Sequence, residues 1–404
     1  MDLKRISNHV RNMQNKYKNR ISRIDLKYKK YLLEHNKVIA RAYIILFLMR
    51  NLLNILLLMI HSLALFQNKD AGPKDILFIE PLQQGYGDLF IQTPLFEALN
   101  KNDCKVHILC KKSHSDIIRN NPYINKLLFW KKSDIAFILK NRYKLIIGLG
   151  RDTIRENLLM LSKPCTKKYI LDSDLKLWKE SFSELSTPKA WQKILDYYTK
   201  KENHYSLPKV YLSKKEKKEV SKLRQEYKKP RVGLIVGVGN KLKLYPFWAK
   251  IIEELNQRPG SINIFLLGSK NNLGFPSSGR LVNFTLAPTY RKAIITIAAA
   301  DIIVGAEGSL IHIAAALGKN LVLLEGSDAF YKNSFLEIGS PKITILSHHR
   351  CKLWLNTRLM LEKRYCFLDK EGKIIRNNPC LANIKPKNII DQIKKHIKLS
   401  SSNR

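Results

Sequence analysis

The sequence predicts an α/β protein with two parallel-sheet domains, and three observations support this prediction. Short apolar runs alternate with helical patterns over two successive stretches, residues 76–201 and 232–324. Glycine, proline or charged residues bound most of these runs, as is typical of buried strands in parallel sheets. Hydrophobic residues make up 45% of the 404-residue chain, which is enough for sizeable cores. Two halves of similar size imply a cleft between them, and such clefts are common ligand sites.

The N-terminal residues form a stretch of different character. Residues 1–41 are basic and rich in helix formers, and residues 42–66 are strongly apolar and long enough to span a membrane. At about 100° per residue, Arg50, Asn54 and His61 fall on one stripe of this helix. That stripe favours a helix lying in the membrane interface over a true span or a soluble packing helix. The basic segment would add attraction to anionic lipid.

The first α/β domain is assigned to residues 71–207, after a helical, membrane-associating extension at residues 1–70. Gly72 and Pro73 mark the linker between the two. The strands expected in this domain are residues 76–79, 106–109, 127–130 and 145–147. The expected helices are residues 88–100, 113–120, 133–141, 151–161 and 188–201.

The second α/β domain is assigned to residues 208–346, because the highly charged segment 200–227 contains Pro208 and marks a boundary. The expected strands are residues 232–236, 262–267, 302–304 and 321–324. The expected helices are residues 247–257, 290–299 and 309–317, the last ended by Gly318. Residues 347–404 are expected to form a cysteine-containing tail with a final helix at residues 389–399.

Charge and cysteine content limit the possible surroundings and partners. The formal net charge is +39, from 72 Lys and Arg against 33 Asp and Glu. A field of that sign attracts nucleic acid, anionic membranes or phosphorylated ligands. The six cysteines form no CxxC pair and no secretory signal is evident, so a reducing cytoplasm fits best. A tail cluster lacks the paired short spacings of zinc ligands, which favours packing thiols over a metal site. Its members are His348, His349, Cys351, Cys366 and Cys380.

The first strand-to-helix turn contains Gly85, Gly87 and Asp88. It matches neither GxxxxGK[ST] nor GxGxxG, so an enzyme that binds a dinucleotide is poorly supported. Asp88 at the start of a helix has two interpretations. It is either a helix cap or a carboxylate that faces the cleft as a general base.

Two turns of the second half carry residues suited to a phosphate. Lys241 and Lys243 lie in a glycine-containing loop after a strand, where a lysine either neutralises a phosphate or is simply solvated. After strand 302–304, a helix begins near Ser309. The free N–H groups at such a start favour an anion, although an ordinary sheet crossover is the alternative.

Three stretches match the pattern of one known family. In ILFIEPLQQGYGDLFIQTPLFEAL, a strand and a turn ending in Gly87-Asp88 precede a Thr-Pro pair at residues 93–94. In the second half, Lys243 stands shortly before Tyr245-Pro246. The third stretch is Glu307-Gly308-Ser309-Leu310-Ile311-His312 followed by IAAALGK. From about residue 76 to 326, the sequence resembles glycosyltransferase family nine, the bacterial heptosyltransferases of lipopolysaccharide core synthesis.

The resemblance implies the architecture called GT-B, with two Rossmann-like domains facing a cleft. It implies inverting transfer of heptose from ADP-heptose to a lipopolysaccharide or lipooligosaccharide core, without a cofactor or metal. Asp88 would be the catalytic base. The donor-binding residues would be Lys243, Glu307, Gly308, Ser309, Leu310 and His312. We assign acceptor binding to Gln84, Tyr86 and Arg151.

The expected partners are the nucleotide sugar, a lipid A–core acceptor and the anionic inner-membrane surface, with the protein peripheral on its cytoplasmic face. Three departures from the family pattern bear on the donor. Glu307 replaces the signature Asp, Gly308-Ser309 replaces Thr-Gly, and residues 268–272 lack the acidic residue expected to meet the nucleotide. A transferase of another nucleotide-activated sugar and an inactive family member therefore stay open. A basic nucleic-acid-binding protein is a further alternative, although no RNP, KH or zinc-finger pattern is present.

Overall fold

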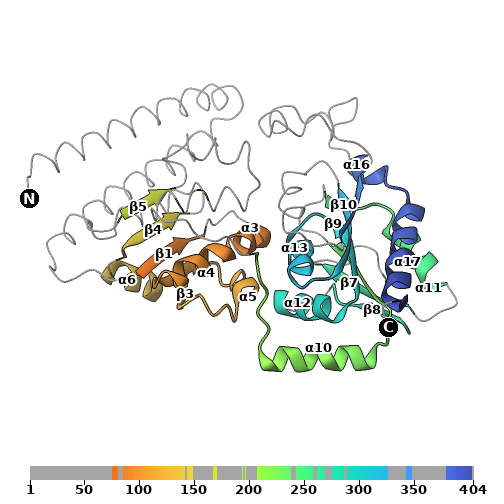
Figure 1. Ribbon diagram of the computed structural model, residues 1–404, viewed down its shortest axis with the longest axis horizontal. Coiled ribbons are helices and arrows are strands. Elements are labelled where there is room, and N and C mark those ends of the chain that lie inside the picture. The colour runs from red at the N-terminus through yellow and green to blue at the C-terminus, as the bar shows by residue number, and fades with distance from the viewer. Residues whose placement is uncertain are drawn as a thin grey trace, which may run out of the picture. The chain divides into compact units, whose positions relative to one another are not determined.

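A computed structural model describes the chain in several ranges. These are residues 75–80, 85–141, 143–148, 167–170, 193, 196, 207–237, 243–257, 262–268, 275–285, 289–325, 343–347 and 379–402. Over these ranges the α/β prediction is confirmed, because two separate parallel sheets carry the fold (Figure 1).

The first sheet has the strand order β3-β2-β1-β4-β5. Its strands are β1 (Asp75–Ile79), β2 (Lys105–Cys110), β3 (Lys126–Phe129), β4 (Leu145–Gly148) and β5 (Lys167–Ile170). Its helices are α3 (Tyr86–Ile91), α4 (Thr93–Lys101), α5 (Ser115–Ile118) and α6 (Lys132–Lys140). The central strand β1 pairs with β2 and β4 on either side, and Leu77, Phe78 and Ile79 are fully buried. The four predicted strands are confirmed, and β5 is an additional edge strand.

The single helix predicted at residues 88–100 is instead two helices, α3 and α4. Thr93 and Pro94 open α4, and the Thr93 hydroxyl donates a 2.8 Å hydrogen bond to the carbonyl oxygen of Phe90. Proline lacks an N–H group and fits only the first turn of a helix, so the chain restarts there. As a result, α3 is a separate short helix that carries Gly87 and Asp88.

The second sheet has the strand order β11-β10-β9-β6-β7-β8. Its strands are β6 (Arg231–Gly237), β7 (Asn263–Gly268), β8 (Leu281–Asn283), β9 (Ile302–Ala306), β10 (Asn320–Glu325) and β11 (Ile343–Ser347). The helices of this half are α10 (Lys214–Glu226), α11 (Trp248–Asn256), α12 (Tyr290–Ala299), α13 (Ser309–Ala316), α16 (Pro379–Ala382) and α17 (Pro386–Ser402). The predicted strands and helices of residues 232–324 are all confirmed, and Gly318 follows α13 with a φ of +64°.

The helix predicted at residues 389–399 is confirmed as α17, which belongs to the core of the second sheet. Ile389, Ile390 and Ile393 are fully buried. The helix packs against α11, β10 and β11, and Figure 1 shows α17 beside α11. The preceding His348, His349, Cys351 and Cys366 lie outside the described residues. Within the described part of the chain, no group of three or more His, Cys, Asp or Glu side chains is placed to hold a metal ion.

The predicted N-terminal extension, residues 1–70, also lies outside the described residues, as do helix 151–161 and most of helix 188–201. Among the residues that are described, none of the helices combines the length and apolarity needed to cross a membrane.

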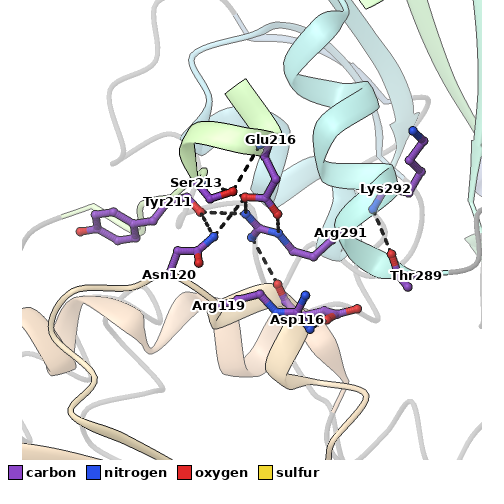
Figure 2. A network of polar contacts seen from close by, with 9 residues as sticks. All are labelled: Asp116, Arg119, Asn120, Tyr211, Ser213, Glu216, Thr289, Arg291 and Lys292. Atoms are coloured by element: carbon purple, nitrogen blue, oxygen red, sulfur yellow. Dashed lines mark hydrogen bonds and ion pairs between the residues drawn. The ribbon is translucent and has the colours of Figure 1, made fainter. Parts of the chain in front are cut away.

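A buried arginine joins the two halves of the fold. Arg291 on α12 donates to Glu216 on α10, and to the carbonyl oxygens of Tyr211 at 2.8 Å and Asp116 at 3.3 Å (Figure 2). The Asn120 side chain, just after α5, donates to Glu216 at 3.0 Å. Burial raises the pKa of Glu216, but its hydrogen bonds to Arg291 and Ser213, together with the charge of Arg291, outweigh that effect and lower the pKa to about 2. The network therefore links α5 of the first half to α10 and α12.

Candidate active site

The predicted anion-binding turn is present at the carboxyl end of β9. The strand ends at Ala306, Glu307 and Gly308 form the turn, and α13 begins at Ser309. The first amide groups of a helix have no partner within the helix and carry the positive end of its dipole. The amides of Gly308, Ser309 and Leu310 are therefore suited to an anion. The side chain of Leu310 is only 9% exposed and belongs to the core, so only its backbone is available.

Three predicted donor-binding side chains meet beside this helix start. Glu307 forms an ion pair with Lys243 through one oxygen, and its other oxygen lies 3.2 Å from Nε2 of His312. Lys243 follows β6, which pairs with β9, so the two loops leave the same edge of the sheet. Burial raises the pKa of Glu307, but His312 and Lys243 outweigh that effect and the pKa lies below its usual range. Glu307 is therefore ionised at neutral pH.

The hydroxyl group of Ser309, at the start of α13, is held by Tyr290, an aromatic residue that was not predicted to belong to the site. The Tyr290 hydroxyl donates a hydrogen bond to Oγ of Ser309. The Tyr290 ring stacks on Tyr86, with centroids 4.3 Å apart and planes 9° apart. Tyr86 begins α3 and Tyr290 begins α12, so this stack joins a helix of the first half to a helix of the second. No local signal marks Tyr290, because a tyrosine at a helix start is unremarkable in sequence.

Tyr86 also contacts His114, with ring centroids 4.2 Å apart. Nδ1 of His114 is hydrogen-bonded to Glu80, whose other oxygen accepts a 3.0 Å bond from the amide of Lys111. Glu80 directly follows β1 and is fully buried. A charged residue immediately after a buried strand is the sequence signal that could have identified this pair.

The first turn and the α13 turn, which belong to different sheets, are brought together. A Cβ atom built on Gly87 would lie 3.5 Å from Cα and Cβ of Ser309 and 3.5 Å from Cδ2 of His312. Helix α3 therefore lies directly against the start of α13. Asp88 is the next residue of α3, and its side chain is not among those described. Gln84 and Arg151 also lie outside the described residues.

Comparisons with known proteins relate one segment of the chain to a known family. Residues 188–330 match the family model of glycosyltransferase family 9 (heptosyltransferase). No curated protein matches the chain. The matched segment contains β6 to β10 and hence Lys243, Glu307 and His312.

Solved structures of this class share the fold at low identity. The Escherichia coli ADP-heptose lipopolysaccharide heptosyltransferase II has a TM-score of 0.61 and 16% identity, covering 81% of this chain and 99% of that one. A family 9 glycosyltransferase of Veillonella parvula has a TM-score of 0.59 and 13% identity, covering 82% and 99%. The E. coli heptosyltransferase WaaC with ADP has a TM-score of 0.52 and 11% identity, covering 80% and 99%.

The fold is that of a GT-B glycosyltransferase. Within this class, the family that the chain resembles is glycosyltransferase family 9, the heptosyltransferases, as its sequence motifs predicted.

Proposed function

We propose that this protein transfers heptose from ADP-heptose to the lipopolysaccharide or lipooligosaccharide core by an inverting single displacement. The observation that carries the proposal is the cluster of Lys243, Glu307 and His312 at the start of α13, inside the segment that matches the family. Two of the similar solved structures are named heptosyltransferases, and one of them was solved with ADP.

The donor diphosphate would bind at the start of α13. A nucleoside diphosphate leaves as an anion, so the reaction gains from positive charge placed there in advance. The amides of residues 308–310 and the ammonium group of Lys243 supply that charge. A carboxylate repels a phosphate, so we assign Glu307 the role of holding Lys243 and His312 in place rather than contacting the donor directly.

The acceptor hydroxyl would be activated by Asp88. An inverting transferase attacks the anomeric carbon directly, so the hydroxyl proton must leave as the new bond forms. The close approach of Gly87 to Ser309 supports this assignment, because it brings the backbone next to Asp88 close to the donor site. Gln84, Tyr86 and Arg151 complete the proposed acceptor side.

The proposal includes no metal and no cofactor, and it places the protein on the cytoplasmic face of the inner membrane. The acceptor is a lipid A–core molecule, which resides in a membrane. The basic and apolar residues 1–70 would hold the enzyme at that surface.

The test is transfer to a purified core oligosaccharide that lacks its heptose. The full-length protein with ADP-heptose should add the mass of one heptose, with or without EDTA, and the new linkage should have inverted anomeric configuration. Parallel reactions with ADP-glucose, UDP-glucose and GDP-mannose test the second candidate function, transfer of another nucleotide-activated sugar. Glu307 in place of the signature Asp favours this candidate. If the protein transfers sugar from only one of these other donors, that donor replaces ADP-heptose in the proposal. If the protein binds none of the donors and transfers no sugar, the proposal is contradicted.

A further inference from the structure

Three aromatic rings from three parts of the chain form one continuous contact. His114 packs on Tyr86, and Tyr86 stacks on Tyr290. We call His114, Tyr86 and Tyr290 the aromatic clasp. His114 lies just before α5, Tyr86 begins α3 and Tyr290 begins α12, so the clasp connects the first half of the fold to the second.

Both ends of the aromatic clasp are anchored by polar contacts. At one end, His114 is bonded to the fully buried Glu80, which also accepts a 3.0 Å bond from the amide of Lys111. At the other end, the Tyr290 hydroxyl is bonded to Oγ of Ser309, the first residue of α13. The stack restrains the two helices that it joins, because Tyr290 cannot slide without breaking its hydrogen bond to Ser309, and Tyr86 cannot slide without leaving the ring of His114.

We propose that Tyr290 is a positioning residue for sugar transfer. Its hydroxyl sets the Ser309 side chain at the donor phosphates, and its ring holds α3, which carries Asp88, against α13. This inference rests on the proposed function, and it adds a residue that the family motif does not contain. The packing of Gly87 within 3.5 Å of Ser309, for a built Cβ atom, is the arrangement that the clasp maintains.

The two roles of Tyr290 are separated by two substitutions. Tyr290→Phe keeps the ring and removes only the hydroxyl, so the donor KM should rise about fivefold while kcat stays within about twofold. Tyr290→Ala removes both, so kcat should also fall by about two- to tenfold, the usual effect of a stacked aromatic pair. Tyr123→Phe is the matched control, because it removes a tyrosine hydroxyl that is bonded to Glu97 instead. Equal loss of kcat in Tyr290→Phe and Tyr290→Ala would overturn the positioning role of the ring.

A second measurement does not depend on enzymatic activity. The 3.5 Å separation between a Cβ atom at Gly87 and Cβ of Ser309 suits a disulfide, for which about 3.5–4.5 Å is typical. The full-length double variant Gly87→Cys/Ser309→Cys should therefore cross-link under mild oxidation, as measured by mass spectrometry of its peptides. Adding Tyr86→Ala or Tyr290→Ala should slow cross-linking about two- to tenfold, because the stack no longer holds α3 in place. Ser309→Cys already removes the hydroxyl group that Tyr290 bonds, so this measurement reports the ring stack alone, and adding Tyr290→Phe or Tyr123→Phe should leave the rate within about twofold.

The outcomes separate this inference from the proposed function. Cross-linking that both alanine variants leave unchanged would overturn the clasp, even if the enzyme transfers sugar. If cross-linking depends on the clasp but the protein binds and transfers no sugar, the contact between the helices is supported and the proposed function is contradicted. The positioning role of Tyr290 in sugar transfer then fails with that function.

Discussion

At the scale of single residues, Glu307 determines the charge of the proposed donor site. Its carboxylate is nearly buried, with the side chain 11% exposed, and yet it stays ionised because His312 and Lys243 are beside it. The start of α13 adds a further favourable field, since negative charge is stabilised at a helix N-terminus. Without a ligand, Glu307 is the partner of Lys243, and a bound diphosphate would share that lysine.

Lys243→Ala should raise the donor KM and lower kcat/KM by one to two powers of ten. A charge-assisted contact contributes about 1.5–3 kcal/mol, and its loss accounts for a reduction of that size. The measurement is steady-state kinetics with varied donor. Lys250→Ala is the control, because Lys250 is an exposed lysine on the neighbouring α11. Donor kinetics equal to wild type would show that Lys243 does not bind the donor.

Asp88→Asn should nearly abolish transfer while the protein still folds and binds donor. A positioned carboxylate contributes about 10²–10⁴-fold to proton removal, whereas an amide cannot accept the proton. Asp88 is the third residue of α3, past the N-cap position, and loss of its charge in the first turn costs only about 0.3–1 kcal/mol, so stability should change little. The check is kcat together with matched melting curves and donor affinity. Turnover within about threefold of wild type would show that Asp88 is not the base.

At the scale of elements, α10 shows how a highly charged segment becomes a defined helix. Only Val220 and Leu223 are buried along its length, so a hydrophobic stripe contributes little. A capping box starts it instead: the Ser213 hydroxyl accepts from the amide of Glu216 at 3.2 Å, and the Glu216 carboxylate accepts from the amide of Ser213 at 2.7 Å. The reciprocal pair satisfies two amides that would otherwise lack partners.

Ser213→Ala should therefore lower the free energy of unfolding by about 1 kcal/mol, the usual cost of losing an N-cap. The measurement is denaturant unfolding of the full-length protein. Ser221→Ala is the matched control, because the Ser221 hydroxyl bonds to the carbonyl of Lys217 one turn earlier, a contact that gives a helix no stability. Equal effects of the two substitutions would show that the cap does not start the helix.

At the scale of the whole molecule, Arg291 and Glu216 join helices from both halves (Figure 2). Arg291 is only 4% exposed at its side chain, so it needs this partner to remain buried. The planar guanidinium reaches Glu216 and two backbone carbonyls together, an arrangement that lysine cannot copy.

The pH dependence of stability should report this ion pair. The pKa of Glu216 is lowered to about 2 from an ordinary value of 4.5, so its contribution is present above pH 4.5 and is lost as the pH falls toward 2. Glu216→Gln should be less stable than wild type at pH 7, and its melting temperature should fall less steeply between pH 5 and 3. Glu219→Gln is the control, since Glu219 is a more exposed carboxylate on the same helix. Parallel pH profiles for wild type and Glu216→Gln would contradict the pairing.

Removal of residues 1–67 should move the protein from the membrane pellet to the soluble fraction. Turnover on a water-soluble truncated acceptor should be retained, because Gly72 and Pro73 separate this segment from the first sheet. The measurement is sedimentation of full-length and truncated protein with and without anionic vesicles. A full-length protein that stays soluble without detergent or lipid would contradict the proposed anchor.

Periodicity and local motifs alone were enough to predict the main strands, most of the described helices and the three turns that meet at the candidate site. These features depend on residues close together in sequence: buried parallel strands need apolar runs, and turns into helices need glycine, serine or acidic residues. The weakest local patterns gave no such signal. The charged helix α10 and the edge strands β5, β8 and β11 were missed, and the break between α3 and α4 at Pro94 was overlooked.

Tertiary structure alone decided which distant residues meet. Tyr290 reaches Ser309 across 19 positions, and Arg291 reaches Asp116 across 175. Nothing local in the sequence specifies such partners, because they depend on how helices pack on finished sheets. The sequence therefore determined two parallel sheets and a cluster of residues suited to a phosphate at their edges. Packing decided that Tyr86, His114 and Tyr290 would join those edges, since side-chain contacts form only where the backbone brings the elements together.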